Sequence, residues 1–273
     1  MPVITVTTDF GLSGPYVAEM KGVILSINPR ASIVDITHLI EPQNIFQASL
    51  IISLAYPHFP DDSIHLVVVD PGVGSSRRAL ILKTPQGIFV APDNGVLSHI
   101  VRSFLGNFSE KDSVFLSGNT LEAVNITNQR YWHHPVSATF HGRDIFAPVA
   151  AYLSLGIPME ACGEKIDSLR VLPIPEVKTY PGYIIGHVAC IDAFGNLITD
   201  VKADYISNLS GIEVHIGRHG IKGPVKTYAE GEGLVFLEGS HGFLEIALVN
   251  GNAREFSGAN VGDEVINRVG GGG

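Results

Sequence analysis

The chain of 273 residues is 45% hydrophobic and only 16% charged, which excludes a largely disordered protein and supplies a core for one large or two modest domains. Its 18 basic residues are outnumbered by 27 acidic ones, the formal net charge is −9, and no run of lysine or arginine occurs. We therefore expect no nucleic acid and no membrane surface among its partners.

Targeting and redox features predict a cytoplasmic protein. The two cysteines, Cys162 and Cys190, form no CxxC pattern and the histidines are scattered, so we expect neither a disulfide framework nor a metal site. The amino-terminal segment lacks the basic region and cleavage site of a signal peptide. The most apolar helix candidate, residues 145–159, is too short to span a membrane.

The first part of the chain predicts a strand–helix–strand unit and hence a parallel sheet. A β-rich run covers Val3–Thr7, apolar residues recur at helical spacing over Val17–Ile27, and a second strand covers Ser32–Ile36. Asp9 follows the first strand, where it either caps the helix or faces a ligand.

A helix is predicted over residues 45–55. The most apolar strand of the chain follows; it begins at Ile64, and Asp70 lies after it, at the start of a Pro-Gly turn. The sequence Asp-Pro-Gly is common in β-turns, because proline and glycine favour the backbone angles that such turns need. A strand that ends in a carboxylate, with Arg77 just beyond it, is also a common way to build an active site. The stretch alone leaves both interpretations open.

The next segment predicts a hairpin of residues 80–82 and 88–90, followed by a helix over residues 96–104. Asp93 or Asn94 precedes that helix, and either one is expected to cap it.

A further helix follows the segment Phe140–Asp144. Asp144 is expected to be its amino-terminal cap, and Arg143 an ion-pair residue. A histidine such as His141, beside a glycine at the start of a helix, is more often an ordinary loop residue than a catalyst.

The composition changes at residues 173–181, where three prolines in nine residues predict a linker. We therefore expect an α/β domain with a mostly parallel sheet over residues 1–172. Short β runs separated by glycines predict a smaller, all-β, barrel-like domain over residues 182–269. Residues 270–273 form a glycine tail.

Two groups of polar residues are candidates for chemistry. Because carboxyl ends of parallel strands share one edge of a sheet, Asp9 and Asp70 are expected to lie at one site. In the β domain, Asp192, Phe194 and Asn196 surround a turn, which alone is most simply an Asx-type turn. The sequence holds no GxGxxG, P-loop, HExxH or GxSxG motif.

Five separated motifs, in order along nearly the whole chain, resemble one family, the S-adenosyl-L-methionine (SAM) hydroxide adenosyltransferases, which are SAM hydrolases related to fluorinase and chlorinase. The motifs are Thr8–Gly11, Val69–Gly74 with Arg77, Ala91–Gly95, Phe140–Asp144 and Asp192–Asn196. The resemblance implies an α/β domain, a β-barrel, and a homotrimer with active sites between subunits. It implies that water attacks C5′ of SAM and releases adenosine and L-methionine, without a cofactor because SAM is the substrate.

The resemblance also implies roles for individual residues. The family's water-handling set falls on Asp70, Arg77 and His141, and Asp9 falls on its ribose contact. The remaining contacts to the adenosine and methionine parts, supplied across the interface, fall on Asp192, Phe194, Asn196, Ser240, Glu245 and Ala253.

Two other functions stay open at this stage. In the halogenase branch, as the resemblance implies, the position of Asp70 is aromatic and a long insertion follows the next strand. Here a carboxylate would repel a halide, and only Thr84–Gly87 joins the two strands. The second alternative is a non-catalytic sensor of SAM or adenosine. The sequence does not determine which sulfonium epimer of SAM is preferred.

Overall fold

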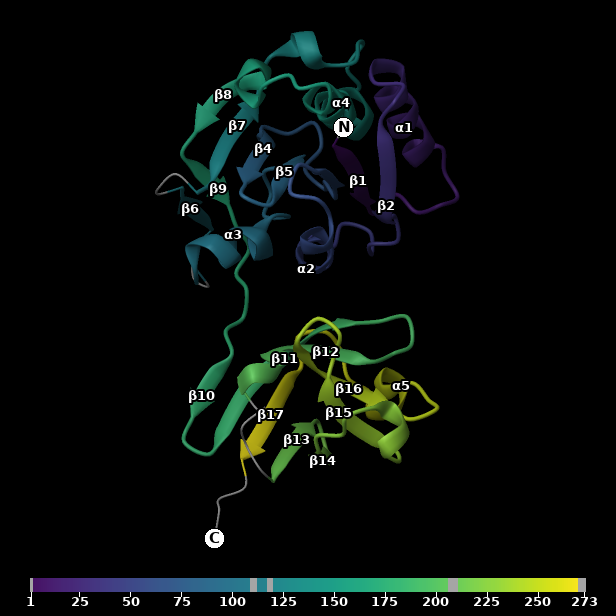
Figure 1. The fold of residues 1–273 in the computed structure, drawn as a ribbon, viewed down its shortest axis with the longest axis vertical. Coiled ribbons are helices and arrows are strands. Elements are labelled where there is room, and N and C mark those ends of the chain that lie inside the picture. Colours follow the sequence, from purple (N-terminus) through teal and green to yellow (C-terminus); the bar gives the residue numbers. More distant parts are fainter. Residues whose placement is uncertain (1, 109–111, 117–119, 206–210, 270–273) are drawn as a thin grey trace. The chain divides into compact units, whose positions relative to one another are not determined.

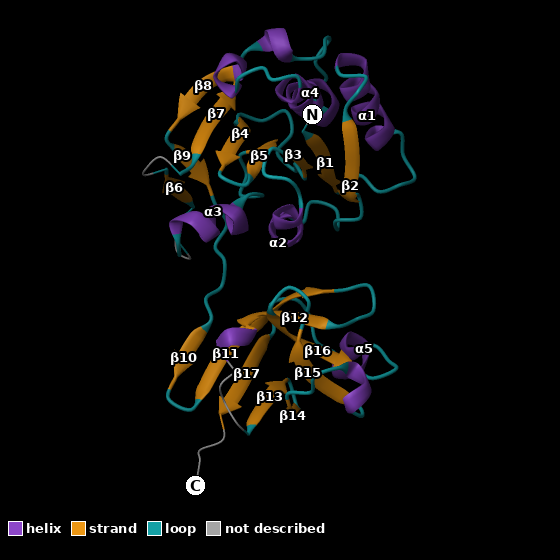
Figure 2. Cartoon of the chain, in the orientation of Figure 1, coloured by secondary structure: helices purple, strands orange, loops and turns teal. Residues whose placement is uncertain are grey.

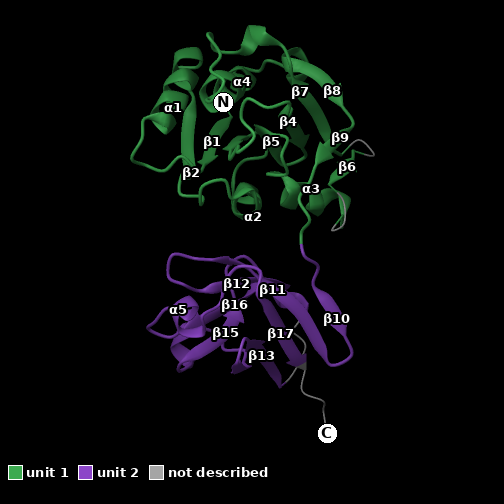
Figure 3. Cartoon of the chain, turned by 180° about the vertical axis from the view of Figure 1, so that it is seen from behind, with its two compact units in different colours: residues 1–174 green, residues 175–273 purple. Residues whose placement is uncertain are grey.

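The computed structural model describes residues 2–108, 112–116, 120–205 and 211–269, so the glycine tail predicted at 270–273 lies outside the described residues. The chain divides into two compact units, Met1–Ile174 and Pro175–Gly273 (Figure 3). No helix within the described ranges is long and apolar enough to cross a membrane.

Unit 1 is built on a seven-stranded sheet with the order β2-β1-β3-β5-β4-β7-β8 (Figure 1). The pairs β1–β2, β1–β3 and β3–β5 are parallel, whereas β4 and β8 run against their neighbours. This arrangement confirms the predicted α/β unit with a mostly parallel sheet. The strands are β1 (Val3–Thr8), β2 (Ser32–Thr37), β3 (Ile64–Val68), β4 (Ala79–Thr84), β5 (Gly87–Pro92), β7 (Glu122–Ile126) and β8 (Gly163–Ile166), and a separate pair joins β6 (Ser113–Phe115) to β9 (Ser168–Arg170).

Helices cover both faces of this sheet. Strand β3 and the residue after it show why. Leu66 and Val68 pack into a core with α1 and α4, whereas Val67 and the following Val69 pack into a second core with α2 and α3. The helices are α1 (Tyr16–Ile27), α2 (Ile45–Ala55), α3 (Ser98–Leu105) and α4 (Ala147–Ser154), with short 3₁₀ turns at Tyr56–His58, Gln129–Tyr131 and Met159–Cys162. A strand buried on both faces reads as a continuous apolar run, as the sequence of β3 does.

The strand order places a topological switch point at the carboxyl ends of β1 and β3. From β1 the chain passes through α1 to β2 on one side, and β3 lies on the other side of β1. Helices α1 and α2 belong to opposite faces of the sheet. The chain therefore leaves β1 over one face of the sheet and enters β3 from the other face. A topological switch point of this kind is where open α/β sheets bind ligands.

Unit 2 is an antiparallel sheet of eight strands with one short helix (Figure 2). Its main order is β14-β13-β17-β11-β12-β16-β15, and the Val225 N–H donates to the Phe236 carbonyl at 3.0 Å, which links the chain after β14 to β15. The sheet therefore curls toward closure, which confirms the predicted barrel-like β domain. Its elements are β10 (Lys178–Tyr180), β11 (Tyr183–Ile191), β12 (Leu197–Lys202), β13 (Ile212–Ile216), β14 (His219–Gly223), β15 (Leu234–Glu238), β16 (Phe243–Leu248), β17 (Glu264–Val269), α5 (Ala253–Ser257) and 3₁₀ turns at Ala203–Tyr205 and Tyr228–Glu230.

Candidate active site

Asp70 lies two residues beyond the end of β3 and forms a bidentate ion pair with Arg77. The Arg77 Nε–H lies 2.8 Å from Asp70 Oδ1 and 3.0 Å from Oδ2, and its Nη2 also donates to Oδ2. Both side chains are more than nine-tenths buried. A planar guanidinium that contacts both carboxylate oxygens fixes the orientation of the carboxylate as well as its charge.

The turn between them fits against the segment that carries His141. Gly74 has φ +77°, and a Cβ at this position would lie 2.5 Å from the Ala138 carbonyl oxygen. Only glycine combines this backbone conformation with such a close approach. The Pro71–Gly74 turn therefore serves as both a turn and a support for the site.

His141 completes a continuous network with Arg77 and Asp70. Arg77 Nη2 lies 2.9 Å from His141 Nδ1. Since a guanidinium can only donate, Nδ1 is the acceptor, and the proton of the neutral ring is on Nε2. Burial and the positive charge of Arg77 lower the pKa of His141, which favours this neutral form. His141 thus offers an N–H donor at Nε2.

A π-helical turn, η3 (Gly142–Phe146), begins at His141 and carries Phe146, whose ring lies 5.1 Å from the Arg77 guanidinium carbon. The prediction that Asp144 caps this helix is wrong. Asp144 lies inside the turn, is fully buried, and accepts hydrogen bonds from Arg143 Nε at 2.7 Å and from the Ser137 N–H at 2.8 Å. It thereby ties the His141 segment to the preceding loop.

Asp9 follows β1 and is not a helix cap. Pro15 occupies the capping position of α1, with no side-chain cap, and Asp9 Oδ2 instead accepts the Gln43 N–H at 2.8 Å. Thr8 is paired in register with Val68, so Asp9 and Asp70 follow neighbouring strand ends at the switch point. The neighbouring strand ends are as expected from the sequence, and a site shared by the two carboxylates stays a prediction.

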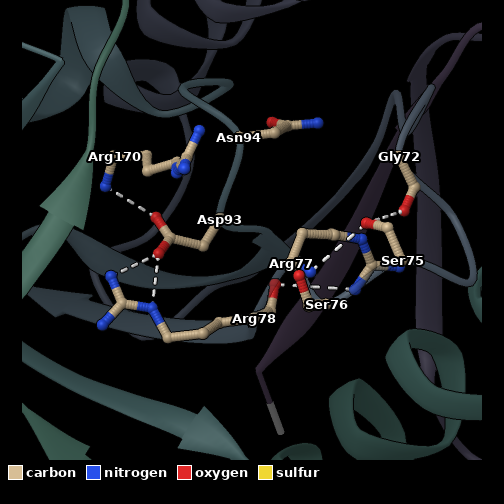
Figure 4. Close-up of a pocket in the computed structure, with 8 residues that line it drawn as sticks. All are labelled: Gly72, Ser75, Ser76, Arg77, Arg78, Asp93, Asn94 and Arg170. Atoms are coloured by element: carbon tan, nitrogen blue, oxygen red, sulfur yellow. Dashed lines mark hydrogen bonds and ion pairs between the residues drawn. The ribbon is translucent and has the colours of Figure 1, made fainter.

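A polar hollow of about 430 Å³ lies beside the Asp70–Arg77 pair (Figure 4). Asp93 accepts from Arg78 Nε at 2.7 Å and from the Arg170 N–H at 2.8 Å. The capping prediction for Asp93 and Asn94 is wrong, because α3 begins only after Leu97, without a side-chain cap. Asn94 Oδ1 accepts the Val96 N–H at 3.1 Å instead. The hollow is lined by Gly72, Ser75, Ser76, Arg77, Arg78, Asp93, Asn94 and Arg170.

Unit 2 holds the second group of predicted residues. Asp192 Oδ1 accepts the backbone N–H groups of Phe194 and Asn196, both at 2.9 Å, and Oδ2 accepts Asn196 Nδ2 at 2.9 Å. The turn is thus a true Asx-type turn, and it presents the Phe194 ring to solvent with 78% exposure. The Arg254 N–H donates to the Gly195 carbonyl at 2.9 Å, which places the buried Ala253 beside this turn.

Glu245 is buried on β16 and accepts the Tyr228 hydroxyl at 2.5 Å. This hydrogen bond is the main cause that raises the pKa of Tyr228 to about 12. Ser240 is exposed in the turn between β15 and β16, 3.4 Å from His241 Nδ1. The sequence analysis missed Tyr228, because it stands in a glycine-rich stretch with no periodic pattern.

Comparison with known proteins decides the family. Residues 4–163 match the SAM hydroxide adenosyltransferase N-terminal domain, and residues 186–266 match the C-terminal domain of the same family. The chain belongs to the SAM hydroxide adenosyltransferase family. The predicted resemblance is confirmed, and it extends over both compact units.

The chain is similar over most of its length to described proteins and to solved structures. An (R)-S-adenosyl-L-methionine hydrolase from Salinispora tropica is 35% identical, over 97% of each chain. A solved structure of an uncharacterized conserved protein from Thermotoga maritima is 38% identical, has a TM-score of 0.87, and covers 97% of this chain and 100% of its own. A fluorinase from Actinoplanes is more distant, at 24% identity over 73% of this chain and 72% of its own.

Proposed function

We propose that this member of the SAM hydroxide adenosyltransferase family hydrolyses (R)-S-adenosyl-L-methionine at C5′ and releases adenosine and L-methionine. The observation that carries the proposal is the network of Asp70, Arg77 and His141 at the carboxyl end of the central strand. The description of relatives as (R)-S-adenosyl-L-methionine hydrolases supports the choice of the (R) sulfonium.

The step that needs catalysis in this reaction is the attack of the water nucleophile. The water oxygen forms a bond to C5′ as the C5′–S bond breaks, and that electron pair stays on sulfur, which leaves as the neutral thioether of methionine. No general acid and no cofactor are needed for this departure. Water must instead be aligned with the C5′–S bond and lose a proton, and such positioning contributes on the order of 7–11 kcal/mol in well-oriented systems.

The three side chains suit that task. Each carboxylate oxygen has two lone-pair directions, so Asp70 keeps the capacity to accept a hydrogen bond from water while Arg77 holds it. The Nε2–H of His141 is a donor toward the oxygen on which hydroxide character develops. We assign Asp70 as acceptor of the water proton, Arg77 as its orienting partner, and His141 as donor.

The binding residues complete the proposal. Asp9 would accept hydrogen bonds from the two adjacent ribose hydroxyls, because one carboxylate offers both oxygens to a diol. Asp192, Phe194 and Asn196 would contact the adenosine part, with Phe194 as the stacking surface. Ser240, Glu245 and Ala253 would contact the methionine and adenine parts.

The proposal includes a homotrimer in which the unit 1 group of one protomer meets the unit 2 group of its neighbour. Exposed apolar side chains support it, since Leu12 beside Asp9 is 73% exposed and Phe194 is 78% exposed. The free thiols of Cys162 and Cys190 support a cytoplasmic location. Light scattering should give the mass of a trimer, and an active monomer would refute the shared site.

A halogenase is the second candidate, and two observations disfavour it. The free lone pairs of the Asp70 carboxylate can accept a hydrogen bond from water, but the carboxylate has no donor to offer a halide. The β4–β5 connection spans only the two residues between Thr84 and Gly87.

The deciding experiment incubates the purified protein with each SAM epimer, with and without added chloride or fluoride, and separates the products by chromatography. We expect adenosine and L-methionine from the (R) epimer and no 5′-halo-adenosine. Formation of the halo-adenosine would favour a halogenase. If neither epimer is consumed while adenosine still binds, the protein is a sensor.

A further inference from the structure

A buried histidine in the loop after β2 contacts the chain on both sides of Asp9. The His38 Nδ1 lies 2.9 Å from Thr8 Oγ1, and the His38 carbonyl accepts the Gly11 N–H at 2.8 Å. The side chain is only 3% exposed. Residues immediately before and shortly after Asp9 are therefore held by this one residue.

The direction of these hydrogen bonds follows from the partners of His38. Its Nε2 lies 3.1 Å from Asp35 Oδ1, an ion contact that lacks hydrogen-bond geometry. Because the negative charge of Asp35 attracts the ring N–H, we place the proton on Nε2, which leaves Nδ1 as the acceptor. The Thr8 hydroxyl then donates to Nδ1, and the same oxygen accepts the Phe10 N–H at 3.3 Å. The chain of hydrogen bonds thus runs from the backbone beside Asp9 into the His38 ring.

Asp35 is itself held as a carboxylate. Burial raises its pKa, but the hydrogen bond from Lys21, at 2.6 Å, and the contact with His38 outweigh this effect and keep the pKa of Asp35 below its usual value. A charged Asp35 fixes the tautomer of His38, in the way that a carboxylate orients a catalytic imidazole.

The same loop also contacts the Asp9 side chain. The N–H that Asp9 Oδ2 accepts belongs to Gln43, which has φ +66°. A positive φ is uncommon for a residue other than glycine and persists only where the surroundings impose it. The loop between β2 and α2 therefore contacts the side chain of Asp9 as well as Thr8 and Gly11 on either side of it.

We propose that His38 is a positioning residue that, through Thr8, holds Asp9 in the geometry that binds the ribose diol. The inference rests on the proposed ribose-binding role of Asp9. It assigns a function to a buried histidine that the water-handling network does not use.

The test measures binding of adenosine and of 2′,3′-dideoxyadenosine, which lacks the diol, to the full-length protein by calorimetry. Thr8→Val removes the hydroxyl at nearly constant volume, His38→Leu removes the acceptor, and His38→Asn returns an acceptor near the Nδ1 position. Thr7→Val is the matched control, because Thr7 is a buried neighbour whose Oγ1 has no partner among the described residues. Asp9→Asn gives the effect of losing the ribose carboxylate itself, and thermal melts show whether each variant is folded.

We expect Thr8→Val and His38→Leu to weaken adenosine binding about three- to tenfold, the range that one lost hydrogen bond produces. His38→Asn should recover part of the loss, Thr7→Val should bind as the unaltered protein does, and dideoxyadenosine should bind all variants alike.

Three outcomes overturn the inference, and they are distinguishable. If Asp9→Asn weakens adenosine binding while Thr8→Val and His38→Leu do not, His38 has no positioning role and the proposed function stands. If Asp9→Asn leaves adenosine binding unchanged, the ribose role of Asp9 fails and the inference fails with it. Equal losses for both nucleosides would show a general structural effect instead of a positioning one.

Discussion

Replacing Gly74 by alanine is expected to separate Arg77 from His141 without removing either side chain. The new Cβ would lie 2.5 Å from the Ala138 carbonyl oxygen, and real Cβ atoms essentially never approach closer than 3.0 Å. One of the two segments must therefore move by roughly half an ångström or more. Since Ala138 lies three residues before His141, the displacement falls on the contact between Arg77 and His141.

The magnitude follows from two separate costs. An alanine at positive φ costs about 1–2 kcal/mol of stability, which lowers the melting temperature by about 2–8 °C for a protein of this size. Misplacement by about 1 Å costs on the order of 100-fold in rate, so half that displacement predicts a loss of about tenfold in kcat.

A matched control separates these costs. Gly156→Ala also places alanine at positive φ, +88°, but its Cβ would meet nothing within 4 Å and it lies after α4. Steady-state turnover and thermal melts of both variants are the assay. We expect a lower melting temperature for both variants, with the larger drop for Gly74→Ala because its Cβ must displace backbone, and a lower kcat only for Gly74→Ala. Equal turnover in the two variants would refute the claim that the turn sets the Arg77–His141 contact.

Two further predictions concern the same network. Arg77→Lys keeps the positive charge but loses the planar guanidinium that contacts both oxygens of Asp70. We expect kcat to fall on the order of 100-fold while the affinity for adenosine stays unchanged. Turnover near that of the unaltered protein would contradict the orienting role. Because burial and Arg77 lower the pKa of His141, its ring stays neutral below the ordinary histidine pKa of about 6.5. The acid-side fall of kcat assigned to this ring should therefore lie below about pH 6.5, and a fall centred above that pH would count against the assignment.

The strands and helices around the site could be predicted because their signals are local. Helix α2 spans Ile45–Ala55, as its apolar pattern predicts, and the β-branched run that ends before Asp70 forms the central strand. The rule that parallel strands end at one edge predicts that Asp9 and Asp70 follow neighbouring strand ends, which the pairing of β1 with β3 confirms.

The errors arose where a distant partner took a polar residue from its expected local role. Asp93 lies just before the apolar pattern of α3, but the helix begins only after Leu97. Asp93 is instead bound by the Arg78 side chain and by the backbone N–H of Arg170, 77 residues away. The hydrogen bond between Tyr228 and Glu245 likewise joins two separate elements of unit 2. Neither contact has a signature in a single sequence, because spacing carries no information about which elements meet.

The central claim is that water, handled by Asp70, attacks C5′ of the sulfonium. The most direct measurement runs the reaction with (R)-S-adenosyl-L-methionine in water enriched in ¹⁸O and analyses both products by mass spectrometry. We predict one heavy oxygen in the 5′-hydroxyl of adenosine and none in L-methionine. Adenosine without the label, or label in a product cleaved at another carbon of the sulfonium, would contradict the account.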